Sequence, residues 1–177
     1  MGTLLAFAGS NSSTSINFRL VRYTVGLIHD RAVDCRDMAE VSIPMYSEDR
    51  ERAAGFPDAI EDLYQALQKT EGLVLSVNEH NGNPSAFTKN LLDWLSRKDR
   101  AFLEGVPILL MSTSPGKRGA QSSHGIIEGM LKRFGGQVTA TFSLPSFKEH
   151  FGEDGIAELE LREAHAHALS LFLQELN

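Results

Sequence analysis

The sequence predicts a doubly wound α/β sheet, in which helices cover both faces of a parallel sheet. Short apolar runs alternate along the chain with longer stretches of helical periodicity, which is the pattern of βαβ units. The run at residues 72–76 has an unbroken apolar centre, as expected for a strand buried on both faces. The length of 177 residues suits one domain, so residues 1–177 are expected to form a single unit.

The first half of the chain contains two predicted strands and two predicted helices. The apolar run at residues 3–8 is predicted to be a strand, and the periodic stretch at 15–30 a helix. A short second strand is expected at 33–37. The long loop predicted at 38–56 is of a length that is often functional. A proline near the first helical position supports a helix at 57–70.

The second half continues the alternation after the central strand. A helix is predicted to begin after Pro84, and strands are expected at 106–111 and 137–142. Two glycines end the helix predicted at 122–134, and a last helix is expected at 155–176. Ligands of such sheets bind beyond the carboxyl ends of the strands, so the loops after strands one, three and four matter most.

The loop at residues 9–17 is dense in hydroxyls and amides and leads into a helix. Free backbone N–H groups at a helix N-terminus bind anions, and hydroxyls add donors, so this neutral cup suits a terminal phosphate. An ordinary turn with an N-cap is the alternative, because the same residue types are common there. The predicted contacts are Ser10, Ser12, Ser15, Ile16 and Asn17.

The loops after the third and fourth strands carry groups suited to a flat ring. Residues 78–84 offer amides and an imidazole, and two glycines in residues 112–120 would let backbone amides approach a planar ligand. Each loop alone is equally well a polar surface connection, but three at neighbouring strand ends are hard to attribute to chance. The predicted contacts are Asn78, Glu79, His80, Asn81, Gly82, Ser112, Ser114, Gly116 and Gly119.

These residues resemble the NADPH-dependent FMN reductases, a flavodoxin-like group that includes FMN-binding quinone, azo-dye and chromate reductases. The matching segments are Gly9-Ser10, Ser15-Ile16-Asn17, Pro44-Met45-Tyr46, Glu79-x-Asn81-Gly82, Lys89-Asn90, Asp93-Trp94-x-Ser96-Arg97, Ser112-Thr113-Ser114-Pro115-Gly116 and Gly119. The resemblance implies a flavodoxin-like three-layer α/β/α sandwich with five parallel strands in the order 2-1-3-4-5.

The resemblance also implies an activity. The protein is expected to bind FMN and to pass hydride from NADPH or NADH to the flavin, and on to a quinone, azo, free flavin or similar acceptor. FMN is favoured over FAD because the first loop suits a terminal phosphate and no dinucleotide fingerprint is present. Since the flavin carries the redox chemistry, no catalytic side chain is predicted.

Two departures from the family pattern affect the expected site. The family commonly has arginine at the position of Ser12, so this chain is predicted to bind FMN less tightly or to rely more on backbone donors. The family commonly has tyrosine, preceded by a Pro-Glu pair, at the position of His80. This histidine is therefore the candidate for tuning the flavin ring.

Two other functions remain open at this stage. The chain could be a flavodoxin-like FMN-binding or carrier protein without nicotinamide turnover. It could also be a partner-binding module that has lost the cofactor, for which the serine at position 12 is the main support.

The composition disfavours nucleic acids and membranes as binding partners. A formal net charge of -6 disfavours binding to nucleic-acid phosphates, and no polybasic membrane patch or long apolar span is present. With a single cysteine, Cys35, and no secretory signal pattern, the protein is expected to be cytoplasmic. The family resemblance implies a homodimer or a dimer of dimers, and Leu92, Trp94 and Leu95 are candidates for its contact, unless they only fill the core.

Several further residues are interpreted as structural. Cys35 is expected to be a small buried residue, and His124 and His150 are expected at the surface. His165 and His167 do not share a helix face, and no metal site is predicted. The charged run at 48–52 is interpreted as a solvated loop tip that could border a substrate opening. Lys117 and Arg118 either meet the phosphates of the pyridine nucleotide or form a solvated turn.

Overall fold

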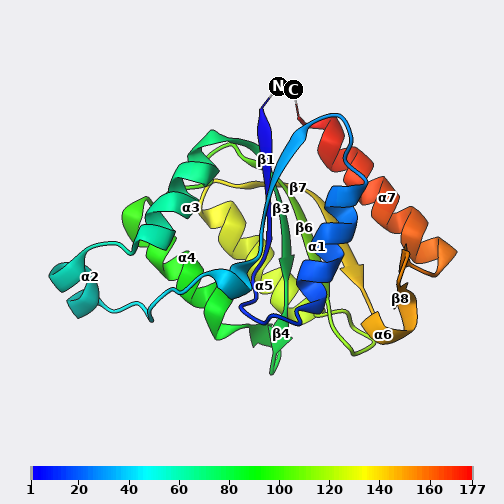
Figure 1. Ribbon diagram of the computed structural model, residues 1–177, viewed down its shortest axis with the longest axis horizontal. Helices are drawn as coiled ribbons and strands as arrows, with labels where there is room; N and C mark the ends of the chain where they lie inside the picture. The colour runs from blue at the N-terminus through cyan, green and yellow to red at the C-terminus, as the bar shows by residue number, and fades with distance from the viewer. Residues whose placement is uncertain (1, 177) are drawn as a thin grey trace.

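A computed structural model describes residues 2–176. Its five long strands form one parallel sheet in the order β2-β1-β3-β6-β7 (Figure 1). These strands are β1 (Thr3–Ala8), β2 (Ala32–Arg36), β3 (Thr70–Val77), β6 (Pro107–Thr113) and β7 (Gln137–Leu144). Counted as the first to fifth long strands, this is the predicted order 2-1-3-4-5, so the predicted sheet is confirmed.

Helices cover both faces of the sheet, which confirms the three-layer arrangement (Figure 1). Helices α3, α4 and α5 pack on one face, and α1 and α7 on the other. Their bounds are α1 (Ile16–Gly26), α3 (Asp58–Lys69), α4 (Ala86–Lys98), α5 (Gln121–Arg133) and α7 (Leu159–Gln174). None of the helices in residues 2–176 is long and apolar enough to cross a membrane.

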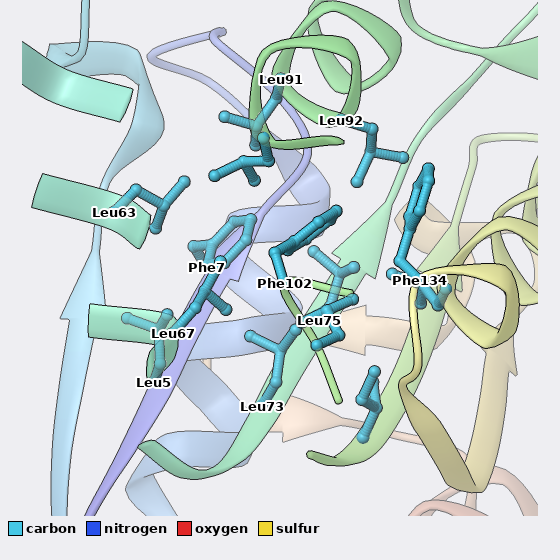
Figure 2. Packing of buried hydrophobic residues seen from close by; sticks show 14 of the residues in the cluster. Leu5, Phe7, Leu63, Leu67, Leu73, Leu75, Leu91, Leu92, Phe102 and Phe134 are labelled. Atoms are coloured by element: carbon cyan, nitrogen blue, oxygen red, sulfur yellow. The ribbon is translucent and has the colours of Figure 1, made fainter. Parts of the chain in front are cut away.

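The strands build two cores because successive side chains of a strand point to opposite faces. Leu5 and Phe7 of β1 pack against α3 and α4, whereas Leu4 and Ala6 pack against α1 and α7. Figure 2 shows the first of these cores, where Phe7 lies among leucines of α3, α4 and β3 and the ring of Phe102.

The ends of two helices differ from the prediction. Helix α1 ends at Gly26 instead of residue 30, because the amides of Leu27 and Ile28 turn back to the carbonyls of Thr24 and Val25, respectively. Helix α7 begins at Leu159 instead of residue 155. The preceding residues form a two-stranded hairpin of β8 (Phe151–Gly152) and β9 (Gly155–Ile156), which follows the short helix α6 (Phe147–His150).

The segment predicted as a long loop at 38–56 is partly helical. It contains a turn of 3₁₀ helix, η1 (Met38–Glu40), and helix α2 (Glu48–Ala54). The interpretation of residues 48–52 as a loop tip is therefore wrong. Ser47 caps α2 by accepting a hydrogen bond from the amide of Arg50 at 3.2 Å, and acidic residues in the first turn favour the helix dipole.

The predicted turn after β3 is a tight hairpin. Strands β4 (Glu79–His80) and β5 (Asn83–Pro84) pair antiparallel. The two turn residues between them, Asn81 and Gly82, have φ values of 53° and 75°. A two-residue hairpin turn needs positive φ at both positions, which is why Asn-Gly forms it readily.

The solvent exposure of several residues differs from the prediction. Cys35 is exposed on β2, because β2 is an edge strand of the sheet, so its expected burial is wrong. Leu92, Trp94 and Leu95 are at most 5% exposed and belong to the core under α4. They are therefore wrong as candidates for a subunit contact. His150 is partly exposed and lies 2.8 Å from the carboxylate of Glu158.

Candidate functional site

The loops that follow β1, β3 and β6 meet at the carboxyl edge of the sheet, near the labels β4 and α1 in Figure 1, and enclose a cavity of about 200 Å³. Its lining residues are Ser10, Ser12, Thr14, Ser15, Ile16, Asn17, Asn78, Glu79, His80, Thr113, Ser114 and Pro115. The predicted meeting of the three loops is thus confirmed. The lining residues that the sequence prediction omitted are Thr14, Thr113 and Pro115. The predicted residues that do not line this cavity are Asn81, Gly82, Ser112, Gly116 and Gly119.

The first loop has donors available to an anion. Ser15 caps α1, because its Oγ accepts a hydrogen bond from the amide of Phe18 at 3.1 Å. The amides of Ile16 and Asn17 in the same turn have no acceptor within the helix, and the helix dipole favours negative charge there. Ser12 Oγ lies 3.2 Å from Thr14 Oγ1, and both residues are exposed.

The side chain of Asn17 ties helix α1 to two strands, β3 and β6. Its Oδ1 accepts hydrogen bonds from Ser76 Oγ at 2.8 Å and from the amide of Thr113 at 3.0 Å. Its Nδ2 donates to the carbonyl of Thr113 at 3.1 Å, and the residue is only 2% exposed. The side chain therefore fixes the spacing of the loops, and it is the backbone amide of Asn17 that remains available in the cup.

Glu79 joins the second loop to helix α5. Its Oε2 accepts a hydrogen bond from the amide of Ser123 at 3.1 Å, and Ser123 Oγ donates to the carbonyl of Asn78 at 2.7 Å. The N-cap residue of α5, Ala120, has no side chain that could cap the helix. The carboxylate of Glu79 caps the helix instead, from another loop. Because the two residues are far apart in the sequence, the sequence alone does not predict the bond between Glu79 and Ser123.

Two side chains of the second loop remain open toward ligands. Asn78 Oδ1 is buried and accepts no hydrogen bond from residues 2–176, and this residue lines the cavity. His80 is exposed at the mouth, with its Nε2 3.4 Å from Asn78 Nδ2. A heteroaromatic ring with an N–H donor matches the vacant acceptor of Asn78.

The third loop is held in shape by hydroxyls of the two strands beside it, β6 and β7. Ser112 Oγ donates to the carbonyl of Gly119 at 2.7 Å, and Ser143 Oγ donates to the same carbonyl at 2.8 Å. His124 Nδ1 lies 3.0 Å from Ser112 Oγ and must be the donor, since the Ser112 proton is already engaged. His124 is buried, so its expected surface position is wrong, and burial lowers its pKa.

The basic residues of the third loop lie on its outer turn. Lys117 and Arg118 are exposed, and Arg118 Nη2 donates to Ser122 Oγ at 3.1 Å. Arg118 also lies 3.8 Å from the carboxylate of Glu79. Neither basic residue lines the cavity, so the local arrangement favours a solvated turn.

Together, the strand order and the donor-rich loop at the start of α1 define a flavodoxin-like α/β protein with a cavity at the carboxyl edge of the sheet, where ligands of such sheets bind. The family model described as NADPH-dependent FMN reductase matches residues 3–146. The chain therefore belongs to the NADPH-dependent FMN reductase family.

Characterised relatives agree with this assignment. An NAD(P)H-dependent FMN reductase of Pseudomonas aeruginosa is 29% identical over 117 residues, which are 66% of this chain and 62% of that protein. A quinone reductase of Escherichia coli is 29% identical over 114 residues, 64% of this chain and 60% of that protein. The matched regions thus span less than two thirds of these relatives.

A solved structure shows the same fold along nearly the whole chain. FerB, a flavoenzyme NAD(P)H:(acceptor) oxidoreductase from Paracoccus denitrificans, superimposes with a TM-score of 0.76 and 20% sequence identity, covering 99% of each chain.

Proposed function

We propose that the protein is an FMN-dependent NAD(P)H oxidoreductase, which uses bound FMN to transfer hydride from reduced nicotinamide to a small-molecule acceptor. Membership of the family supports this proposal. The observation that carries it is the cavity at the carboxyl edge, where a neutral anion-binding cup and two ring-facing loops come together. Residues 1–177 would then act as a single flavin-binding domain.

The residues present fit FMN. The hydroxyls of Ser12 and Thr14 and the amides of the first turn of α1 suit a terminal phosphate. The vacant Oδ1 of Asn78 suits the N–H of a flavin ring. When bound, FMN supplies the hydride-accepting chemistry, and the protein supplies binding, orientation and electrostatics.

The chain's own residues have distinct tasks in this proposal. Ser12, Thr14 and Ile16 hold the phosphate, while the loops at 78–80 and 113–115 flank the ring. The side chains of Asn17 and Glu79 position these loops, through the contacts described above. His80 lies at the cavity mouth, where it can tune the ring and the approach of the nicotinamide.

The cofactor and the activity can be tested separately. Flavin released by denaturation is identified chromatographically, and FMN is expected; recovery of FAD alone contradicts the proposed cofactor. Anaerobic stopped-flow mixing of the FMN-loaded protein with NADPH, and separately with NADH, is expected to bleach the flavin. If only a chemical reductant bleaches it, the protein is an FMN-binding or carrier protein instead.

We also propose a homodimer, which the family resemblance supports. Because Leu92, Trp94 and Leu95 are buried within the protomer, the contact must use other residues. Among residues 2–176, the exposed large apolar side chains are Leu27, Met45, Ile126, Leu159 and Leu171. Light scattering at micromolar concentration is expected to give twice the protomer mass, and a stable monomer contradicts the proposal.

A further inference from the structure

The first turn of helix α5 lies behind the cavity, where two adjacent residues hold the two loops that flank it. We propose that Ser123 and His124 act as one clamp, which sets the distance between these loops and so positions the flavin ring without touching it. This inference rests on the proposed function, because that function places the ring between residues 78–80 and 113–115. Neither Ser123 nor His124 lines the cavity, so both are positioning residues.

Ser123 holds the second loop by its backbone and by its side chain. Its amide donates to Glu79 Oε2 at 3.1 Å, and its Oγ donates to the carbonyl of Asn78 at 2.7 Å. The hairpin of β4 and β5 also packs against α5. Asn78 carries the buried Oδ1 that is vacant in the cavity, so the position of this acceptor depends on the hydroxyl of Ser123.

His124 holds the third loop through one intervening side chain. Its Nδ1 donates to Ser112 Oγ at 3.0 Å, and the same Oγ donates to the carbonyl of Gly119 at 2.7 Å. A serine hydroxyl rotates to suit its partners, so a donor fixed on its acceptor side also fixes the direction of its proton. His124 therefore keeps the hydroxyl of Ser112 directed at Gly119.

The backbone that His124 holds in this way is strained. Gly119 and Ala120 both have left-handed φ values, of 55° and 65°, and a residue with a Cβ adopts this conformation only at a cost in free energy. The amide of Gly119 donates to the carbonyl of Gly116 at 3.2 Å, and the amide of Gly116 to Ser114 Oγ at 3.3 Å. A shift at Gly119 is therefore passed on to Ser114, which lines the cavity.

The two loops thus share one anchor. Because Ser123 and His124 are neighbours in one helical turn, the loops can separate only if this turn moves or if one side chain releases its loop. Such a release widens the space for the ring, whereas the phosphate cup on the first loop and α1 keeps its own contacts. The clamp therefore predicts a loss of ring binding with no change in the contribution of the phosphate.

Two matched pairs of variants separate these hydrogen bonds from packing. His124→Leu removes the Nδ1 donor at similar volume, and His124→Asn restores a donor near the position of Nδ1. Ser123→Ala removes the hydroxyl, and Ser123→Thr keeps it. Gln121→Ala is the control, since Gln121 is exposed in the same turn and does not line the cavity.

Titration of each apoprotein with FMN, and with riboflavin, which lacks the phosphate, measures the two contributions. In His124→Leu and in Ser123→Ala, both Kd values are expected to rise by roughly tenfold, the effect of losing one hydrogen bond, so that their ratio stays that of the parent protein. His124→Asn, Ser123→Thr and Gln121→Ala are expected to bind both flavins as the parent does. Unchanged Kd values in His124→Leu and Ser123→Ala, or a rise for FMN alone, overturn the proposal.

The double variant tests whether the two side chains act as one clamp. Once one loop is free, releasing the other adds little, so the combined rise in Kd is expected to be smaller than the product of the two single rises. A combined rise equal to that product shows two independent contacts and overturns the clamp.

Hydrogen exchange of the apoprotein gives a readout that needs no flavin. His124→Leu is expected to speed exchange of the amides at 114–119, and Ser123→Ala that of the amides at 78–80, with exchange in β1 unchanged. Uniformly faster exchange shows a general loss of stability and overturns the proposal. If the parent protein binds neither flavin, the proposed function is wrong and the positioning of the ring with it. If the parent binds both and the variants bind them equally well, only the clamp is wrong.

Discussion

The loop after β1 and the end of strand β6 contain the same kinds of residue but use them differently. In the first loop, the hydroxyls of Ser12 and Thr14 are exposed, and among residues 2–176 they bond only to each other and to their own loop. At the end of β6, Ser112 and Thr113 are buried, and each hydroxyl donates to a backbone carbonyl. Composition therefore marks both segments as polar, and burial decides which hydroxyls can meet a ligand and which hold the fold.

The largest effect on stability is expected from a substitution in the loop after β6, which is held by hydroxyls of β6 and β7. Gly119 has a φ of 55°, and a Cβ there would clash with Ser143 Oγ and approach the carbonyl of Leu144 at 3.0 Å. Gly119→Ala is expected to lower the free energy of unfolding by about 3 kcal/mol, measured by urea denaturation. Gly116→Ala is the control, because its Cβ would meet only Ser114 Oγ at 3.7 Å. Equal stability of the two variants would refute the locked conformation.

The stability of the protein is expected to fall in acid because of the buried side chain of His165. Thr24 Oγ1 donates to the carbonyl of Leu20 at 2.9 Å, so His165 Nε2, 2.8 Å away, must donate to Thr24. Burial lowers the pKa of His165 to about 4, so the unfolded chain binds the proton more readily. Stability is then lost as the pH falls below the unfolded pKa of about 6.5, by about 2 kcal/mol at pH 5.

His165→Leu removes this titrating group. Urea unfolding of the variant, measured between pH 7 and pH 5, is expected to lose most of that pH dependence. If the free energy of unfolding changes with pH equally in the variant and in the parent protein, His165 is not the cause of the pH dependence. His124 titrates with the same sign, because burial lowers its pKa as well, and it accounts for part of the remaining slope.

Substitutions in the loop after β1 are expected to change ligand affinity rather than stability. Ser12→Glu sets a carboxylate beside the proposed phosphate and is expected to weaken FMN binding by at least roughly tenfold, about 1.4 kcal/mol. Ser12→Arg is expected to strengthen it through a charge-assisted contact. Ser13→Glu is the control, since Ser13 is exposed in the same loop but does not line the cavity. Titration of the apoprotein with FMN measures all three, and equal affinities would exclude this placement of the phosphate.

The smallest effect on affinity is expected at the mouth of the site. His80→Ala should change the rate of flavin reduction by NADPH more than it changes the Kd for FMN, because the phosphate cup lies elsewhere in the cavity. Stopped-flow absorbance gives the rate and fluorescence titration the Kd. A large loss of affinity with an unchanged rate would show that His80 anchors the cofactor.

The sequence predicts the sheet well because most of its strands are short apolar runs separated by longer helical stretches. It predicts the meeting of the three loops for the same reason, since parallel strands place their carboxyl ends at one edge. It does not predict which partner each polar side chain takes. Glu79 and Asn17 have the residue types of ligand contacts, but their side chains bind Ser123 and Thr113, which lie far along the chain.

Two burial errors have a similar origin. Cys35 is exposed because β2 is an edge strand, and local pattern does not distinguish an edge strand from a central one. His124 is buried because the first turn of α5 packs against the end of strand β6 at Ser112, a contact between separate segments. Both depend on the assembled fold rather than on neighbouring residues.

The bond between Glu79 and Ser123 also limits how the site can be redesigned. Because that bond joins the carboxylate of Glu79 to a backbone amide in the first turn of α5, an exchange of residues 78–84 that removes the glutamate leaves this amide without its acceptor. Exchanges of residues 78–84 must therefore keep a carboxylate at position 79. The segment at 43–46 is anchored instead by Asn90 and Trp94 of α4 and by the hydrogen bond from the Tyr46 hydroxyl to Glu51 of α2, so it can be altered without breaking the bond between Glu79 and Ser123.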